Sequence, residues 1–139
     1  MYLSTVRDLD TTKYFTPNML GGSMEYDMDL SEVGCGCVTA LYSILMPHVE
    51  DGEDEFKYCD ANNVGGHWCP EFDLMEANKF AFHSTAHRCD APTNGIYDTC
   101  DRAGECTLNV LTNDRPGDFI PGSLDGIDTN QEFHVKVDF

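Results

Sequence analysis

Three carboxylates lie within six residues of this chain, at Glu71, Asp73 and Glu76. A double-displacement glycosidase needs such a set: an ionised nucleophile, a protonated acid and a third group that tunes them. Glu71 and Asp73 are two residues apart, so they share one face of a strand. Glu76 has the wrong parity for that face, but one extra residue, a β-bulge, brings it back. The spacing therefore permits this chemistry, provided that the two glutamates lean to about 5–5.5 Å between carboxyl groups.

The same segment also has a helical interpretation. Asp73 and Glu76 have the spacing of a capping box, and Ala77, Phe80 and Ala81 follow with helical periodicity. Spacing alone gives the helix and the bulged strand about equal weight. Both interpretations stay open at this point.

Composition limits the classes of protein to which the chain can belong. A length of 139 residues suffices for one domain with its own core, and a hydrophobic content of 41% argues against disorder. The formal net charge of −17 argues against nucleic acid and anionic membranes as partners, because both attract positive charge. A neutral polysaccharide suits this charge, although many acidic proteins are merely soluble. The sequence contains no apolar run of membrane length and no signal-peptide pattern.

Seven cysteines are present, and none forms the C-x-x-C unit that a zinc site needs. Disulfides in an oxidising compartment are therefore favoured, which predicts a secreted, extracellular protein. Because seven is odd, at least one thiol is free or bonded outside the chain. We expect no metal site, since His67, His83 and His87 lack ligand spacing on any one element.

Hydrophobic patterning predicts strands more than helices. Polar and apolar residues alternate over 23–30 and 133–139, and 38–46 is a largely apolar run that suits a buried strand. Loops are expected at an acidic stretch, at a glycine-rich stretch and at a long Gly/Pro/Asn/Asp-rich region, which are 50–55, 62–67 and 90–128. We predict one all-β domain over residues 1–139, built as an antiparallel β-sandwich.

The chain resembles glycoside hydrolase family 7 over nearly its whole length and in the same order. Glu71-x-Asp73-x-x-Glu76-Ala77-Asn78 matches the family's Glu-Met-Asp-x-Trp-Glu-Ala-Asn strand, with Met75 in place of the Trp. Other matches are 25–31 with Phe-Asp-Val-Asp-Val-Ser, Cys35-Gly36-x-x-x-Ala40-Leu41-Tyr42 with Cys-Gly-Leu-Asn-Gly-Ala-Leu-Tyr, and His87-x-Cys89 with His-Pro-Cys. The family's catalytic domain is longer on both sides. The resemblance thus implies part of a jelly-roll, concanavalin A-like sandwich.

The resemblance also implies roles for individual residues. Glu71 would be the nucleophile and Glu76 the acid/base of a retaining hydrolase that cleaves β-1,4-glucan. Asp73 would hydrogen-bond Glu71 and help to separate the pKa values of the two glutamates. His87 would lie near the acid/base. Three aromatic side chains would contact the sugar chain, namely Tyr42, Tyr58 and Trp68. No cofactor is expected for such a hydrolysis.

The cysteines suggest an alternative function. By resemblance, Cys59 pairs with Cys69 and Cys89 with Cys100, whereas the partners of Cys35 and Cys106 in the family lie outside this segment and Cys37 is extra. Part of a sandwich with open sheet edges invites strand pairing between chains. The alternative is therefore a non-catalytic wall, matrix or filament protein that self-associates through these edges or through Cys35, Cys37 and Cys106.

Overall fold

The computed structural model describes residues 14–46, 58–109 and 119–139. The regular secondary structure in these ranges consists of β-strands: β1 (Ser23–Met28), β2 (Thr39–Ile44), β3 (Glu71–Asn78), β4 (Ala81–His87), β5 (Cys106–Asn109), β6 (Phe119–Ile120), β7 (Ile127–Asp128) and β8 (Phe133–Asp138). The all-β prediction is confirmed, and these ranges contain no helix able to cross a membrane. The acidic loop expected over 50–55 lies outside the described residues.

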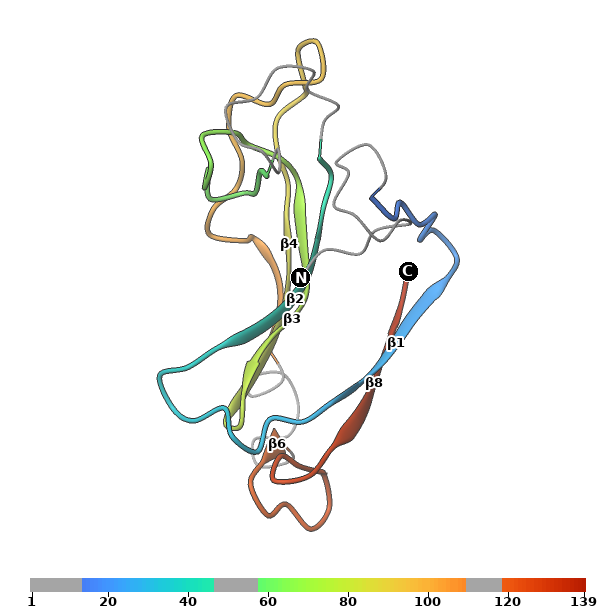
Figure 1. Cartoon of the computed structure of the whole chain (residues 1–139), viewed down its shortest axis with the longest axis vertical. Helices are drawn as coiled ribbons and strands as arrows, with labels where there is room; N and C mark the ends of the chain where they lie inside the picture. The colour runs from blue at the N-terminus through green and yellow to red at the C-terminus, as the bar shows by residue number, and fades with distance from the viewer. Residues whose placement is uncertain (1–13, 47–57, 110–118) are drawn as a thin grey trace.

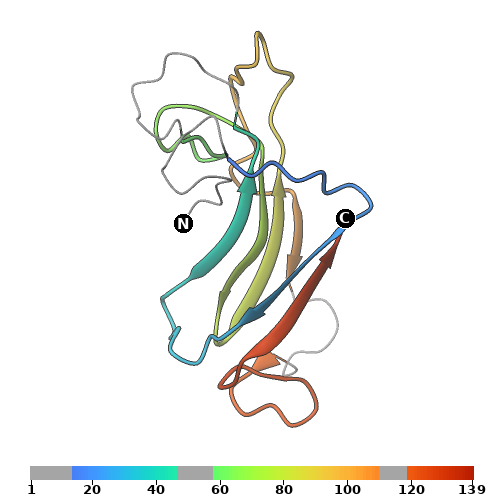
Figure 2. The ribbon, with the colours of Figure 1, turned by 45° about the vertical axis from the view of Figure 1, so that its right-hand side comes forward.

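Two antiparallel sheets face each other, as Figures 1 and 2 show. The larger sheet has the strand order β2-β3-β4-β5, and β1 pairs with β8 in a two-stranded ribbon. The sheets come together near β6 and diverge towards the end of β8 (Figure 1). The predicted sandwich is therefore present. Among the strands in the described ranges, only the two-residue strands β6 and β7 pair in parallel.

β3 runs through the larger sheet with β2 on one side and β4 on the other. Against β4, the three steps from Asp73 to Glu76 oppose only two steps, from Thr85 to His83. A matching register shift occurs against β2. The predicted β-bulge is thus confirmed, and the helical interpretation of this segment is wrong. Backbone pairing on both sides of β3 outweighs the local capping signal.

The hydrophobic core lies between the sheets at the β6 end. Phe119 of β6 connects them, with ring centroids 5.7 Å from Phe82 in the larger sheet and 5.8 Å from Phe133 in the ribbon, both edge to face. Met75 and Ala77 of β3 are buried in the same core. Glu76 lies between these two residues in a strand, so it points to the opposite face of the sheet.

Candidate active site

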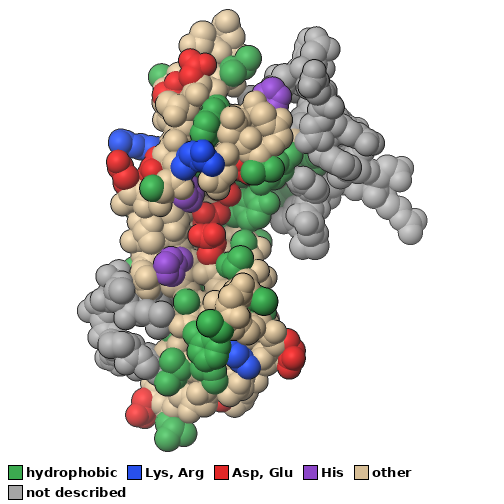
Figure 3. Space-filling model, turned by 90° about the vertical axis from the view of Figure 1, so that its left-hand side faces the viewer, with side chains coloured by type: hydrophobic (Ala, Val, Ile, Leu, Met, Phe, Trp, Pro, Cys, Tyr) green, Lys and Arg blue, Asp and Glu red, His purple; other side chains and the backbone are tan. Residues whose placement is uncertain are grey.

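The candidate carboxylates lie on the face of the larger sheet that points away from the ribbon. Glu71 and Asp73 precede the bulge and Glu76 follows it, so the extra residue places all three on this face. Alternate residues of β4, including His83 and His87, lie opposite them in the register. Figure 3 looks onto this side of the molecule and shows acidic and histidine side chains gathered in its middle.

Glu71 is held by a loop that a disulfide closes. Its Oε2 accepts a hydrogen bond from the backbone N–H of Ala61, at 3.0 Å. The disulfide between Cys59 and Cys69 joins the two ends of this loop. Inside the loop, the Asp60 carboxylate accepts two backbone N–H groups, at 2.9 and 3.0 Å. The loop is therefore fixed where it meets the candidate nucleophile.

The surroundings of Glu71 favour its protonated form. Burial raises the pKa of Glu71 above its ordinary value, and the charges of Asp73 and Asp60 raise it further. The hydrogen bond from Ala61 and the charge of His87 act in the opposite direction without cancelling the rise. Glu71 consequently becomes ionised at a higher pH than an exposed glutamate does.

Asp73 and His87 form a buried ion pair. Asp73 Oδ2 lies 3.0 Å from His87 Nε2, and the two residues are only 5% and 9% exposed. His87 Nδ1 lies 2.7 Å from the carbonyl oxygen of Asp101, to which it donates. Burial alone lowers the pKa of His87, but the Asp101 carbonyl and the charges of Asp73 and Glu71 outweigh this effect and raise it. The site therefore favours the charged imidazolium, which donates from both nitrogens.

Two details implied by the resemblance are corrected here. Asp73 hydrogen-bonds His87 and not Glu71. His87 lies opposite Glu71 in the register, whereas His83 is the histidine opposite Glu76. β3 and β4 form an antiparallel hairpin, in which residues close to the turn pair with each other and residues far from it pair with each other. Glu76 is close to the turn and Glu71 is distant from it.

A second disulfide fixes the loop that carries Asp101. Cys89 and Cys100 are joined, so Asp101 follows directly after a crosslink. The Asp101 carboxylate accepts three backbone N–H groups from residues 103–105, at 3.1, 3.0 and 2.6 Å. These hydrogen bonds lower the pKa of Asp101. Each of the two disulfides thus braces a loop that delivers one hydrogen bond to the site.

Gly104 lets this loop pack tightly against the ion pair. Its φ is +73°, and a Cβ there would overlap Thr85 Cγ2 and lie 3.1 Å from His87 Cε1. We expect Gly104→Ala to lower the free energy of unfolding by about 2 kcal/mol or more, from overlap and backbone strain together. Urea unfolding measures this loss.

Gly95→Ala is the matched control for that substitution. Gly95 has a φ of +81°, but a Cβ there would meet nothing within 4 Å. Gly95→Ala should therefore lower the free energy of unfolding only through backbone strain, by about 1 kcal/mol. Equal losses in the two variants would contradict the close packing of Gly104 against His87.

The three aromatic candidates have different surroundings. Tyr42 of β2 and Tyr58 lie with their hydroxyl oxygens 3.2 Å apart. Burial, the hydrogen bond with Tyr42 and the nearby Asp60 raise the pKa of Tyr58 well above its ordinary value, so its hydroxyl stays neutral. Trp68 carries the Arg102 guanidinium carbon 5.9 Å from its ring centroid, so a cation occupies one ring face.

Known proteins similar to the chain include endoglucanases and a cellobiohydrolase. Endoglucanase EG-1 of Trichoderma longibrachiatum is 30% identical, and the match covers 91% of this chain and 30% of that protein. Among solved structures, an endoglucanase I complexed with cellobiose superposes with a TM-score of 0.78 at 25% identity, covering 93% of this chain and 40% of that one. A GH7 family cellobiohydrolase from Daphnia pulex superposes with a TM-score of 0.72 at 21% identity, covering 93% and 41%. The chain is thus similar to glycoside hydrolase family 7 over most of its length.

The chain spans about 30% of the length of the curated relatives that it matches. No family model matches it. The similarity to these enzymes is therefore supported by individual relatives and by the shared fold, and not by a family model.

Several groups of the candidate site were not predicted. The donor to Glu71 and the acceptor from His87 are backbone groups, of Ala61 and Asp101, which carry no signal in side-chain identity. Ser84 of β4 donates from its hydroxyl to the carbonyl oxygen of Asp73, at 3.0 Å. This hydrogen bond satisfies a carbonyl at the bulge, where the ladder is irregular. Nothing in the sequence around Ser84 indicates that role.

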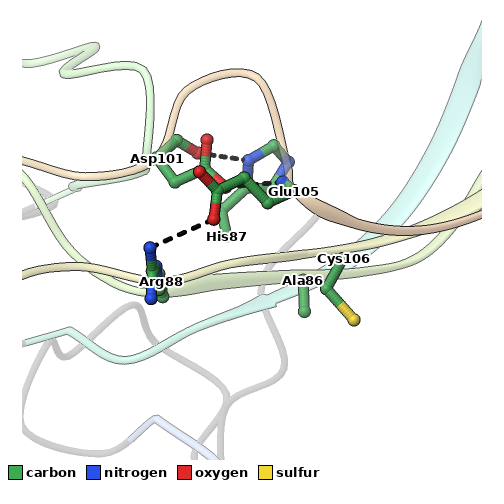
Figure 4. A pocket seen from close by; sticks show the side chains of 6 residues that line it. All are labelled: Ala86, His87, Arg88, Asp101, Glu105 and Cys106. Atoms are coloured by element: carbon green, nitrogen blue, oxygen red, sulfur yellow. Dashed lines mark hydrogen bonds and ion pairs between the residues drawn. The ribbon is translucent and has the colours of Figure 1, made fainter.

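A hollow of about 310 Å³ lies beside His87 (Figure 4). Its lining residues are Ala86, His87, Arg88, Asp101, Glu105 and Cys106. Arg88 and Glu105 form an exposed ion pair at 3.0 Å along it.

Cys35, Cys37 and Cys106 are exposed free thiols. Within the described ranges, no group of three or more His, Cys, Asp or Glu side chains is arranged to hold a metal ion.

Proposed function

We propose that this protein is a retaining glycoside hydrolase that cleaves β-1,4-glucan, a cellulose-like polysaccharide, by double displacement. The observation that carries the proposal is the bulge in β3, which brings Glu71, Asp73 and Glu76 to one face of the sheet. The similarity to endoglucanases over most of the chain supports the substrate class.

In the proposed reaction, Glu71 attacks the anomeric carbon while Glu76 protonates the leaving oxygen. Water then releases the glycosyl–enzyme, with Glu76 acting as the base. The hydrogen bond from Ala61 orients the Glu71 carboxylate. The Asp73–His87 ion pair supplies a fixed charge distribution beside it. No step of this reaction requires a cofactor.

We further propose that Tyr42, Tyr58 and Trp68 contact the glucan. Aromatic side chains suit the apolar faces of sugar rings, and tyrosine adds a hydroxyl for hydrogen bonding. Action outside the cell is supported by the two disulfides, since such bonds persist in oxidising compartments. Self-association through open sheet edges or through Cys35, Cys37 and Cys106 stays a separate prediction.

Hydrolysis of a soluble β-1,4-glucan tests the proposal. The purified protein should release reducing sugar, and proton NMR during the first minutes should show the new chain end as the β-anomer. Retention of configuration is the signature of a double displacement. Absence of hydrolysis, or initial release of the α-anomer, would reject it.

A further inference from the structure

The two ends of the candidate site differ in how far their side chains are already engaged. At the Glu71 end, the Ala61 N–H donates to Glu71, and Asp73 and His87 bind each other. At the other end, neither the Glu76 nor the His83 side chain has a hydrogen bond or ion pair with any residue that the structure describes. Half-buried polar side chains that no described residue engages are suited to receive a ligand.

His83 lies beside Glu76 by strand pairing. The two residues are directly opposite each other in the antiparallel register of β3 and β4. Opposite residues on one face have Cβ atoms about 4.5–5.5 Å apart. Both side chains are half-buried. His83 thus reaches the same small region of the sheet face as the candidate acid/base.

The other neighbours of Glu76 leave this region to His83. On β2, the residue opposite Glu76 is Ala40, whose methyl group forms no hydrogen bond. His87 has both ring nitrogens engaged, with Asp73 and the Asp101 carbonyl. On the strands that flank Glu76, His83 is therefore the side chain that offers an imidazole nitrogen to a bound molecule.

We propose that His83 is a substrate-contacting residue that hydrogen-bonds the sugar whose oxygen Glu76 protonates. An imidazole donates from one nitrogen and accepts at the other, which matches the paired donor and acceptor character of a sugar hydroxyl. The contact lies on the leaving-group side, because Glu76 acts on the leaving oxygen. This inference rests on the proposed function and assigns a specificity role to a residue outside the carboxylate motif.

Two substrates separate this role from a structural one. 4-Nitrophenyl β-cellobioside has an aryl leaving group, whereas cellotetraose places a sugar next to Glu76. We expect His83→Ala to lower kcat/KM for cellotetraose about tenfold and to change it less than about twofold for the aryl substrate. His83→Gln keeps a donor and should recover part of the loss. Equal losses on both substrates, or none on either, would overturn the inference.

A binding measurement tests the contact between His83 and sugar independently of turnover. The ring protons of His83, assigned by their absence in His83→Gln, should shift in NMR spectra when cellobiose is added. Those of His134 should not, since it lies on the ribbon and pairs with Asp27. A His83 shift in a protein without hydrolysis would keep the contact and reject the proposed function. An unmoved His83 signal would reject the contact, whatever the activity.

Discussion

Glu71→Gln should reduce hydrolysis of β-1,4-glucan by at least about a thousandfold. The amide cannot form the glycosyl–enzyme that the proposed double displacement requires, and loss of a nucleophile costs about this much or more. Release of reducing sugar, measured for both proteins at equal concentration, checks the prediction. Equal rates would exclude Glu71 as the nucleophile.

The same variant should fold at least as well as the wild type. Gln retains an oxygen that accepts the hydrogen bond from Ala61, so the loop keeps its contact. Because the pKa of Glu71 is raised by burial, its ionised form costs stability at neutral pH. This cost is absent below about pH 4.3, the ordinary value for glutamate, and grows as the pH rises to the folded value. Gln should therefore equal or exceed the wild type in stability at pH 7, with a smaller difference near pH 4.

The raised pKa of Glu71 should also appear in the pH dependence of hydrolysis. Glu71 must be ionised to attack, so hydrolysis should fall as the pH drops through its raised pKa. We expect the acidic limb of the pH–kcat/KM profile to lie above the ordinary glutamate value. An acidic limb at or below about 4.3 would contradict the assignment of this limb to Glu71.

His87→Ala should lower the free energy of unfolding by about 3 kcal/mol. The substitution leaves the Asp73 carboxylate buried without its partner, and breaking a buried pair costs about this much. It also removes the hydrogen bond to the Asp101 carbonyl. Urea unfolding at pH 6 measures the loss, with circular dichroism as the probe.

The pH dependence of that loss has a definite sign. The pKa of His87 is raised in the folded protein, so its stabilising contribution is fully present below about pH 6.5, the ordinary histidine value. The contribution is lost as the pH rises through the folded value. The difference between wild type and His87→Ala should therefore shrink at alkaline pH.

His134→Ala serves as the control for this measurement. His134 also lies next to a carboxylate, at 2.9 Å from Asp27, but its side chain is 55% exposed. Exposed pairs contribute about 0–1 kcal/mol. A loss at His134 as large as that at His87 would show that burial of the Asp73–His87 pair does not matter for stability.

The carboxylate spacing by itself specified much of the candidate site. Residues two apart share a strand face whatever the fold, so Glu71 and Asp73 were placed together without a structure. The parity of Glu76 then required a bulge, which the register of β3 contains. The alternation over 23–30 and 133–139 also identified β1 and β8. These features depend on local geometry, which the order of residues determines.

The choice between helix and strand for this segment was decided by tertiary structure. The spacing of Asp73 and Glu76 fits a helix cap as well as a bulged strand. The pairing of β3 with both β2 and β4 is what decides for the strand. β4 was not predicted, because Ala81–His87 shows no clean alternation, and β5 is a short strand within a region expected to be loop. Their positions follow from hydrogen bonding to β3 and to each other.

Tertiary structure also decided which groups act on each carboxylate. The sequence places His87 eleven residues after Glu76, yet the hairpin sets His83 opposite Glu76 and leaves His87 with Asp73. The backbone donor of Ala61 reaches Glu71 only because its loop folds back on the strand. Residue types and spacing thus determined which side chains are candidates for the proposed chemistry. The pairing of distant segments determined the partners, burial and pKa of each group, because these depend on contacts that no local pattern encodes.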